Sequence, residues 1–206
     1  MLRTYSLLVV AGLVPLAGCS KSAAASGKER EQAQAELVAR GEQLVKLGGC
    51  GDCHTPMRFD AKLGMPVPVK ERMFSGHPEG APEPKNAPGA GDQAVINATF
   101  TSFRLPFGTV YSANLTPDRQ TGLGAWTADE FVKTMRSGHH KGTGRAVLPP
   151  MPWQNLSQTP EADLKAMFAY LQNIPAVKNR VPVPNVPPAV IDGFAKSYAV
   201  AARGGH

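Results

Sequence analysis

Apolar residues recur at helical spacing in three stretches of the chain, and each stretch has a recognisable boundary. The first is an apolar face over residues 37–48, which a pair of glycines ends. The second follows the sequence TADE at 127–130, a capping box that opens a short helix closed by a glycine. The third, over residues 159–175, begins with Thr-Pro and ends at a proline. We therefore predict three helices, with Thr159 as the cap of the third.

Two proline-rich stretches interrupt this pattern. Residues 56–113 contain eight prolines and no sustained period, and only residues 94–107 have enough apolar side chains to form short strands or pack inward. Because the stretch has too few large apolar residues for a core of its own, we expect an ordered insertion and not a separate domain. Near the end, residues 181–188 predict a stiff, extended tail, followed at most by a weak helix.

The N-terminus has the pattern of an export signal. A basic residue precedes an apolar run over residues 7–16, and small residues lead to Cys19. The run is too short to span a membrane as an ordinary helix. Its ending, PLAGC, is similar to the bacterial lipoprotein box, in which residues 1–18 would be removed and the cysteine lipidated. We expect residues 19–30 to tether the folded part outside the cytoplasm; a plain signal cleaved within 22–26 and an uncleaved anchor are the alternatives.

Composition limits the classes of protein that fit. With 206 residues, the chain is long enough for one domain with extensions. The 22 Lys and Arg against 16 Asp and Glu give a net charge of +6, which favours a partner with an acidic surface. The basic residues are scattered and not interleaved with aromatic residues, which argues against nucleic acid as a partner. No carboxylate pair, Ser/His/Asp pattern or phosphate loop indicates acid–base or nucleophilic catalysis.

The sequence Cys50-Gly-Asp-Cys53-His54 directly follows the first predicted helix. A thioredoxin-like dithiol would need a strand before it and a helix after it, the reverse of the order here. A structural zinc site needs four ligands, and these residues supply three. The third interpretation is covalent haem attachment, in which the two thiols add to vinyl groups at one edge of a porphyrin and His54 binds the iron. The export signal and the lack of any cysteine besides Cys19, Cys50 and Cys53 favour it.

An electron-transfer haem usually keeps a second axial ligand, and a thioether raises its potential. Six methionines follow the signal: Met57, Met65, Met73, Met135, Met151 and Met167. Met151 is our candidate, because the prolines of LPPMPW fix the backbone of a loop just before the third helix. The others lie on helical apolar stripes, lie too close to His54 or have no distinguishing feature. The competing candidates are His77, His139 and His140.

The order of helix, CxxCH, loops, short helix, methionine loop and C-terminal helix resembles that of the class I c-type cytochromes. The resemblance covers about residues 31–178 and includes NLTPD, TGLGAWTADEFVKTMRSG and LPPMPWQNLSQTPEADLKAMFAYLQNIP. These stretches are similar to the monohaem modules of cytochrome subunits in bacterial membrane dehydrogenases and to small lipoprotein cytochromes. The resemblance implies an all-α, cytochrome c-like fold over residues 31–180, with crossing terminal helices and one covalent haem c in the core. A Pro/Gly-rich insertion at about 57–113 and a tail at 181–206 depart from the family pattern.

The resemblance also implies the surroundings of the haem. Gly41 of the first helix would meet Phe168 or Tyr170 of the third where the two helices cross. Asn114 or Arg145 would reach a haem propionate. The apolar pocket would include Trp126, Phe131, Leu148, Trp153 and Leu171.

We therefore expect a lipid-anchored monohaem cytochrome c on the periplasmic side of a bacterial membrane, either the inner or the outer one. It would carry single electrons between a redox donor and an acceptor and would not itself be an enzyme. One alternative is a cytochrome subunit that functions only when docked in a dehydrogenase or oxidase complex. Another is a five-coordinate haem protein that senses a gas or reduces peroxide through an open distal site.

Overall fold

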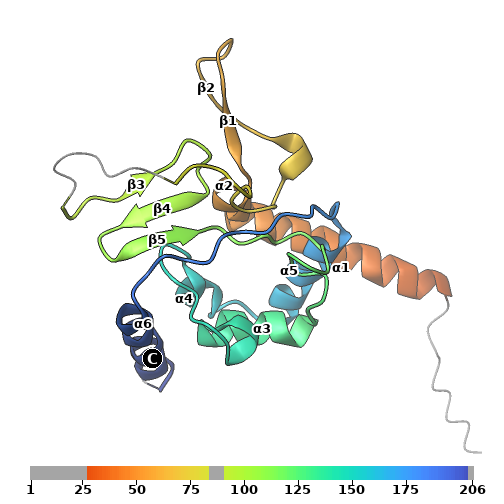
Figure 1. Cartoon of the computed structure of the whole chain (residues 1–206). Helices are drawn as coiled ribbons and strands as arrows, with labels where there is room; N and C mark the ends of the chain where they lie inside the picture. Colours follow the sequence, from red (N-terminus) through yellow and green to blue (C-terminus); the bar gives the residue numbers. More distant parts are fainter. Residues whose placement is uncertain (1–26, 84–90, 204–206) are drawn as a thin grey trace, which may run out of the picture.

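The computed structural model of the chain describes residues 27–83 and 91–203 (Figure 1). The helices and strands, in chain order, are α1 (Gly27–Leu47), α2 (Cys50–His54), β1 (Met57–Asp60), β2 (Met65–Pro68), η1 (Lys70–Arg72), β3 (Val95–Ile96), β4 (Ser102–Leu105), β5 (Gly108–Tyr111), α3 (Ala128–Ser137), η2 (His140–Gly142), α4 (Trp153–Leu156), α5 (Glu161–Asn173) and α6 (Pro188–Arg203). The predicted signal and the predicted lipidation site, Cys19, lie outside the described residues. Within those residues, no helix is both long and apolar enough to cross a bilayer.

The expectation of an all-α fold is wrong. Besides six α-helices, the described residues form five short strands in two antiparallel sheets, β1–β2 and β3–β4–β5. All five strands come from the predicted insertion at about 57–113. Tight turns make the pairing local: Asp60 accepts hydrogen bonds from the backbone N–H groups of Lys62 and Leu63 and so closes the β1–β2 turn. The proline-rich, aperiodic stretch therefore contains hairpins, one of which projects from the body (Figure 1).

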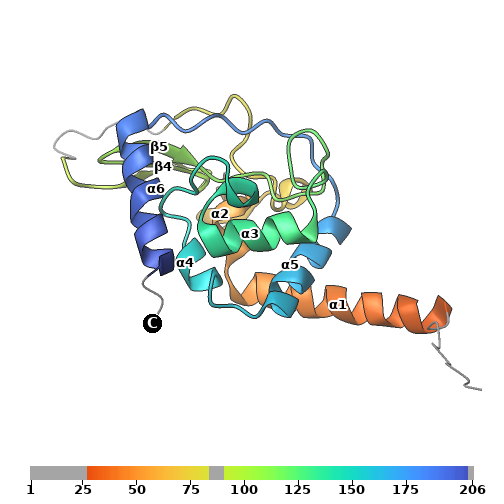
Figure 2. The same ribbon diagram turned by 90° about the horizontal axis from the view of Figure 1, so that it is seen from below.

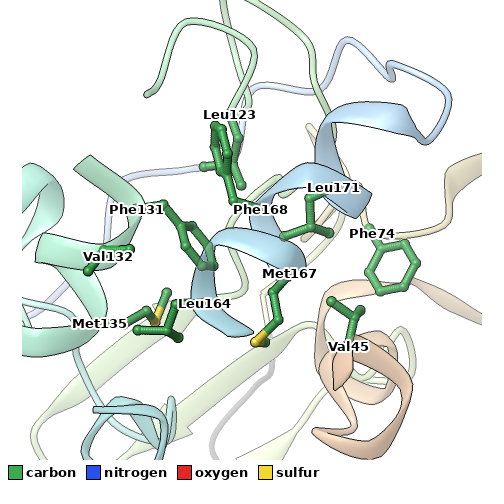
Figure 3. Packing of buried hydrophobic residues seen from close by; sticks show 10 residues of the cluster. All are labelled: Val45, Phe74, Leu123, Phe131, Val132, Met135, Leu164, Met167, Phe168 and Leu171. Atoms are coloured by element: carbon green, nitrogen blue, oxygen red, sulfur yellow. The ribbon is translucent and has the colours of Figure 1, made fainter. Parts of the chain in front are cut away.

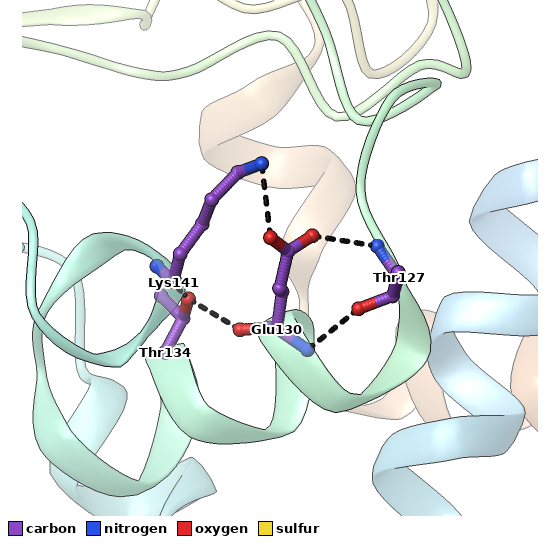
Figure 4. A network of polar contacts seen from close by, with 4 residues as sticks. All are labelled: Thr127, Glu130, Thr134 and Lys141. Atoms are coloured by element: carbon purple, nitrogen blue, oxygen red, sulfur yellow. Dashed lines mark hydrogen bonds and ion pairs between the residues drawn. The ribbon is translucent and has the colours of Figure 1, made fainter.

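Helix α3 begins where the sequence predicts. Thr127 Oγ1 accepts a hydrogen bond from the Glu130 N–H (3.1 Å), and Glu130 Oε2 accepts one from the Thr127 N–H (2.8 Å; Figure 4). Lys141 Nζ pairs with the same carboxylate at 3.1 Å. At α5 the predicted cap is wrong by one residue, because Pro160 and not Thr159 directly precedes the helix. In the part of the chain that the structure describes, no side-chain hydrogen bond caps this end of α5. A capping box thus sets the start of α3, whereas the restricted backbone of a proline sets the start of α5.

Helices α1 and α5 contact each other at Gly41. A Cβ atom on this residue would lie 1.9 Å from the carbonyl oxygen of Ala166 and 2.9 Å from Tyr170 Cβ. Only glycine permits such a close approach of two helix backbones. At the edge of the contact, Arg40 donates two hydrogen bonds to Asp163, at 2.9 and 3.0 Å. The part of α1 that precedes this contact extends past the rest of the molecule (Figure 2).

Two apolar clusters form the core. The first joins α1, α3 and α5, and its α5 side chains lie between those of α3 and Val45 of α1 (Figure 3). Its buried members are Val45, Phe74, Leu123, Phe131, Val132, Met135, Leu164, Met167, Phe168 and Leu171. The second joins the β4–β5 hairpin, α4 and α6, with buried members Phe103, Val110, Ala146, Leu148, Trp153, Val186 and Tyr198. The loop before α4 therefore lies where the two clusters meet.

Asn179 joins the insertion to the chain that follows α5. Its buried side chain donates hydrogen bonds to the carbonyl oxygens of Ser75 (2.6 Å) and His77 (2.9 Å). The side-chain oxygen Oδ1 of Asn179 accepts hydrogen bonds from Arg72 Nη2 (2.8 Å) and from the backbone N–H of Glu79 (2.9 Å). Both the oxygen and the nitrogen of this buried amide have hydrogen-bond partners, so it can fix the insertion without an unpaired group of its own.

The predicted C-terminal tail lies against the body. Thr109 of β5 and Asn185 exchange two backbone hydrogen bonds of 3.0 and 2.9 Å, so this part of the tail runs beside the sheet. Helix α6 follows and packs on the β4–β5 hairpin, with the rings of Phe107 and Phe194 5.1 Å apart. The β3–β4–β5 sheet, α6 and the loop before α4 consequently lie together on one side of the molecule.

Candidate functional site

A cavity of about 540 Å³ lies between α2, α3, α5, the β4–β5 hairpin and the chain from η2 to α4. Four residues singled out in the sequence line it together: Cys50, Cys53, His54 and Met151. Apolar side chains make up most of the remaining wall: Phe103, Val110, Phe131, Met135, Leu148, Leu156, Met167 and Leu171. A mostly apolar cavity of this volume with a few convergent polar groups is typical of a small-molecule or cofactor site.

Gly49 turns the chain from α1 into α2. It adopts a left-handed conformation with φ +62°, which a residue with a Cβ rarely adopts. Helix α1 ends as the Gly48 N–H donates to the Leu44 carbonyl oxygen (2.8 Å), and α2 begins as the Asp52 N–H donates to that of Gly49 (3.0 Å). The reversal brings Cys50 to the cavity directly after the helix.

His54 is buried and held in one orientation. Its Nδ1 lies 2.8 Å from the carbonyl oxygen of Ala113, and since a carbonyl can only accept, Nδ1 carries the proton and donates. Nε2 is then the nitrogen with a free lone pair. Burial lowers the pKa of the imidazole, which keeps the ring neutral near pH 7. A neutral histidine anchored through Nδ1 is the usual form of a metal ligand.

Cys50 and Cys53 are free thiols, the first half-buried and the second exposed. Burial raises the pKa of the Cys50 thiol to about 11, and burial together with the neighbouring Asp52 raises that of Cys53. A redox dithiol depends on the opposite effect, a lowered thiol pKa. The element order also differs from that of a thioredoxin site, because α1 precedes the motif and β1 follows it.

Met151 reaches the cavity from the loop before α4. Its half-buried side chain touches both apolar clusters. The loop backbone is bonded on each side: the Met151 N–H donates to the Leu148 carbonyl oxygen (3.3 Å), and the Trp153 N–H donates to that of Met151 (2.9 Å). The thioether therefore enters the cavity from a different segment than α2 does.

The expected pocket residues divide into two groups. Phe131, Leu148 and Leu171 line the cavity, as does Arg145 at its edge, but neither tryptophan is among the described residues that line it. Trp126 packs beside His140, with ring centroids 5.6 Å apart. Trp153 lies behind the methionine loop in the second cluster. The proposed propionate partner Asn114 instead donates from Nδ2 to the carbonyl oxygen of Val177 (2.8 Å).

One of the three competing histidines lines the cavity. This is His140, and burial together with Arg145 lowers its pKa to about 4, so the ring is neutral. His139 Nδ1 donates to the Ser137 carbonyl oxygen at 2.9 Å, and His77 is buried with Nδ1 3.0 Å from Thr101 Oγ1. His140 therefore stays the competing axial ligand.

Sequence reasoning missed part of the cavity wall. Phe103, Val110 and Tyr111 of the β4–β5 hairpin line it, as does Pro184 of the C-terminal segment. The only signal for the hairpin was the apolar content of residues 94–107, and this gave no indication of the surface on which it packs. Nothing in the local pattern marked Pro184.

The residues around the cavity fit a covalently bound haem. Two thiols three positions apart lie on one turn of a helix, beside an imidazole whose Nε2 is free. A thioether enters from another segment, and apolar side chains surround the space between them. The donor set and the size of the space therefore agree with that cofactor.

No protein-family model matches the chain. The cytochrome c subunit of gluconate 2-dehydrogenase from Pantoea cypripedii is 32% identical over 143 residues, which are 69% of this chain and 24% of the relative. The cytochrome c subunit of a quinone alcohol dehydrogenase from Gluconobacter oxydans is 28% identical, over 69% of this chain and 22% of the relative. A subunit of nicotinate dehydrogenase from Pseudomonas putida is 29% identical, over 72% of this chain and 9% of the relative.

The chain thus spans a quarter or less of the length of these relatives. A further similar protein is the cytochrome subunit of a fructose dehydrogenase, from Gluconobacter japonicus, with 24% identity over 88% of this chain. Homologues of this chain are cytochrome c subunits of bacterial dehydrogenases, which supports a c-type cytochrome and implies haem c as its cofactor.

Proposed function

We propose that this chain is the electron-transfer cytochrome c subunit of a membrane dehydrogenase complex and carries one covalent haem c. The observation that carries the proposal is the common cavity of Cys50, Cys53, His54 and Met151. The homologues support a subunit of a complex better than a free carrier. A single CxxCH motif in the sequence supports one haem.

The chain's own residues have separate roles in this proposal. Cys50 and Cys53 would hold the haem through thioether bonds, and His54 and Met151 would supply ligands to its iron. The bound haem would supply a centre that accepts and donates one electron at a time. The Ala113 carbonyl oxygen orients the His54 ring, and the apolar wall would keep water away from the bound haem. Ligands held in place by two separate segments of the chain would keep the reorganisation on electron transfer small.

Sequence features support a proposal about the location and the partners. We propose export and lipidation at Cys19, which would hold the chain at the periplasmic side of a membrane. The net charge of +6 favours a redox partner with an acidic docking surface.

If the chain is a subunit of a complex, it will co-purify with a dehydrogenase after the membranes are solubilised in mild detergent. A free carrier will separate from every larger protein in the same purification.

The direct test of the cofactor is a haem stain of the full-length chain after denaturing electrophoresis. The chain is expressed in a bacterium that has a cytochrome c maturation system. A covalent c-type haem remains with the polypeptide in detergent, so the band will stain. A folded, exported chain without a stained band would refute the proposal.

Replacing Met151 with alanine removes the proposed thioether ligand. We expect the oxidised protein to lose its sulfur-to-iron charge-transfer band and its midpoint potential to fall by about 0.2 V, within the roughly 0.8 V range that axial ligands set. Absorption spectroscopy and a redox titration measure the two effects. Met65→Ala is the matched control, because Met65 is an exposed residue of the β1–β2 hairpin.

If the band persists in Met151→Ala, the thioether assignment is wrong. His140 is then the ligand to test, since its neutral ring lines the same cavity. A high-spin spectrum in the wild-type protein would instead indicate an open distal site and favour a gas sensor or a peroxidase.

A further inference from the structure

Helix α6 contacts the outside of the loop that carries Met151. Its residue Tyr198 is 5% exposed and belongs to the second apolar cluster. The Tyr198 hydroxyl donates a hydrogen bond to the carbonyl oxygen of Val147 at 3.0 Å. The ring lies against Trp153, with centroids 4.7 Å apart and planes at 73°. Tyr198 thus contacts the loop on both sides of Met151: at Val147, four residues before it, and at Trp153, two residues after it.

The point that Tyr198 holds is fixed from the other side as well. The Val147 N–H donates to the carbonyl oxygen of Gly138 at 2.7 Å, so α3 holds one end of this residue and α6 the other. Gly138 ends α3 in a left-handed conformation with φ +68°, and a Cβ there would lie 2.4 Å from the Trp153 ring. The loop is therefore clamped between the end of α3 and α6.

Tyr198 does not line the cavity; the residues that do so include Val147, Leu148 and Met151 from the loop in front of it. Any effect of Tyr198 on a group in the cavity must pass through the position of that loop. Its hydroxyl donates to the Val147 carbonyl oxygen with good geometry, and replacement by phenylalanine removes this bond while the ring stays in place.

We propose that Tyr198 is a positioning residue that keeps the Met151 loop closed on the cavity. This inference rests on the proposed function, in which Met151 is an axial ligand of a haem. Loss of one hydrogen bond shifts the equilibrium between a closed and an open loop toward the open form. Because an external ligand binds only when the loop is open, its apparent affinity reports the open fraction directly.

The experiment is a titration of the oxidised, haem-loaded, full-length protein with imidazole, followed by loss of the sulfur-to-iron band. In Tyr198→Phe we expect the apparent dissociation constant for imidazole to fall about threefold to tenfold, the range that one net hydrogen bond implies. Tyr198→Leu, which also removes the contact with Trp153, will lower it further. Tyr170→Phe is the matched control, since Tyr170 packs between α1 and α5 and does not line the cavity.

The outcomes separate the inference from the proposed function. A purely structural role would lower the melting temperature of Tyr198→Phe but leave its imidazole affinity within twofold of the wild type, and that result overturns the inference. The wild-type and Met151→Ala proteins are measured first. Absence of covalent haem refutes the proposed function and the inference with it. Covalent haem without a band that depends on Met151 refutes the thioether assignment, and the inference with it, but not the proposed function.

Discussion

Cys50→Ala combined with Cys53→Ala leaves a polypeptide without covalently bound haem. Each thiol supplies one thioether bond in the proposed attachment, so the double variant will lose the whole haem stain after denaturing electrophoresis. Each single variant keeps one thiol at the cavity and will retain part of the stain. Both alanine side chains are smaller than cysteine, so the variants introduce no overlap with neighbouring atoms.

The single variants are the internal control for expression and export. A double variant whose stain equals that of the wild type would contradict the proposed attachment. The apolar cavity of about 540 Å³ makes a second effect measurable. Because the haem would fill this apolar cavity in the folded chain, the double variant leaves the cavity empty and will also unfold at a lower temperature than the wild type in a calorimetric scan.

Gly41→Ala strongly destabilises the fold. The added methyl would lie 1.9 Å from the Ala166 carbonyl oxygen, and neither backbone can move unless α1 and α5 separate. Overpacking in a core costs about 1–3 kcal/mol, and a clash with a helix backbone belongs at or above the upper end of that range. We expect the free energy of unfolding to fall by about 3 kcal/mol, with a melting temperature about 6–12 °C lower. Urea unfolding followed by circular dichroism measures the change.

Gly27→Ala is the matched control, since it is the same substitution in the same helix with nothing within 4 Å of the added methyl. Alanine has the higher helix propensity, so this variant will be as stable as the wild type or slightly more so. Equal stability of Gly41→Ala and the wild type would mean that α1 and α5 do not approach each other at Gly41.

Three of the six α-helices in the described residues, α1, α3 and α5, were predictable because their signals are local. The apolar face that starts at residue 37 runs to the end of α1, and the capping box at Thr127 starts α3. The sheets were predictable only in part: residues 94–107 were expected to form short strands or pack inward, and β3 and β4 lie within them. The resemblance to an all-α family left no place for a sheet, and the packing of the sheets depends on distant residues. Asn179, which follows α5 in the chain, donates hydrogen bonds to the carbonyl oxygens of Ser75 and His77. No periodicity in the sequence could reveal a contact between such distant residues.

The candidate site shows the same division between local and distant information. Cys50 and His54 are close together in the chain, and proline spacing marked Met151; all three line one cavity. Trp126 and Trp153 lie near that cavity without lining it, because an aromatic residue in a sequence does not reveal which of two clusters it joins. The hairpin wall was missed because it packs on the cavity through contacts far apart in the sequence.

The exposed part of α1 sets the distance between Gly27 and the contact with α5. From Gly27 to Gly41 the helix rises about 20 Å at roughly 1.5 Å per residue, and its residues before Gly41 are almost all exposed. A force applied at Gly27 therefore acts on the rest of the molecule through the contact between α1 and α5. Cys50 follows this contact in the chain. Shortening α1 by whole turns before Gly41 would bring Gly27 closer to the cavity and leave the residues around the cavity unchanged.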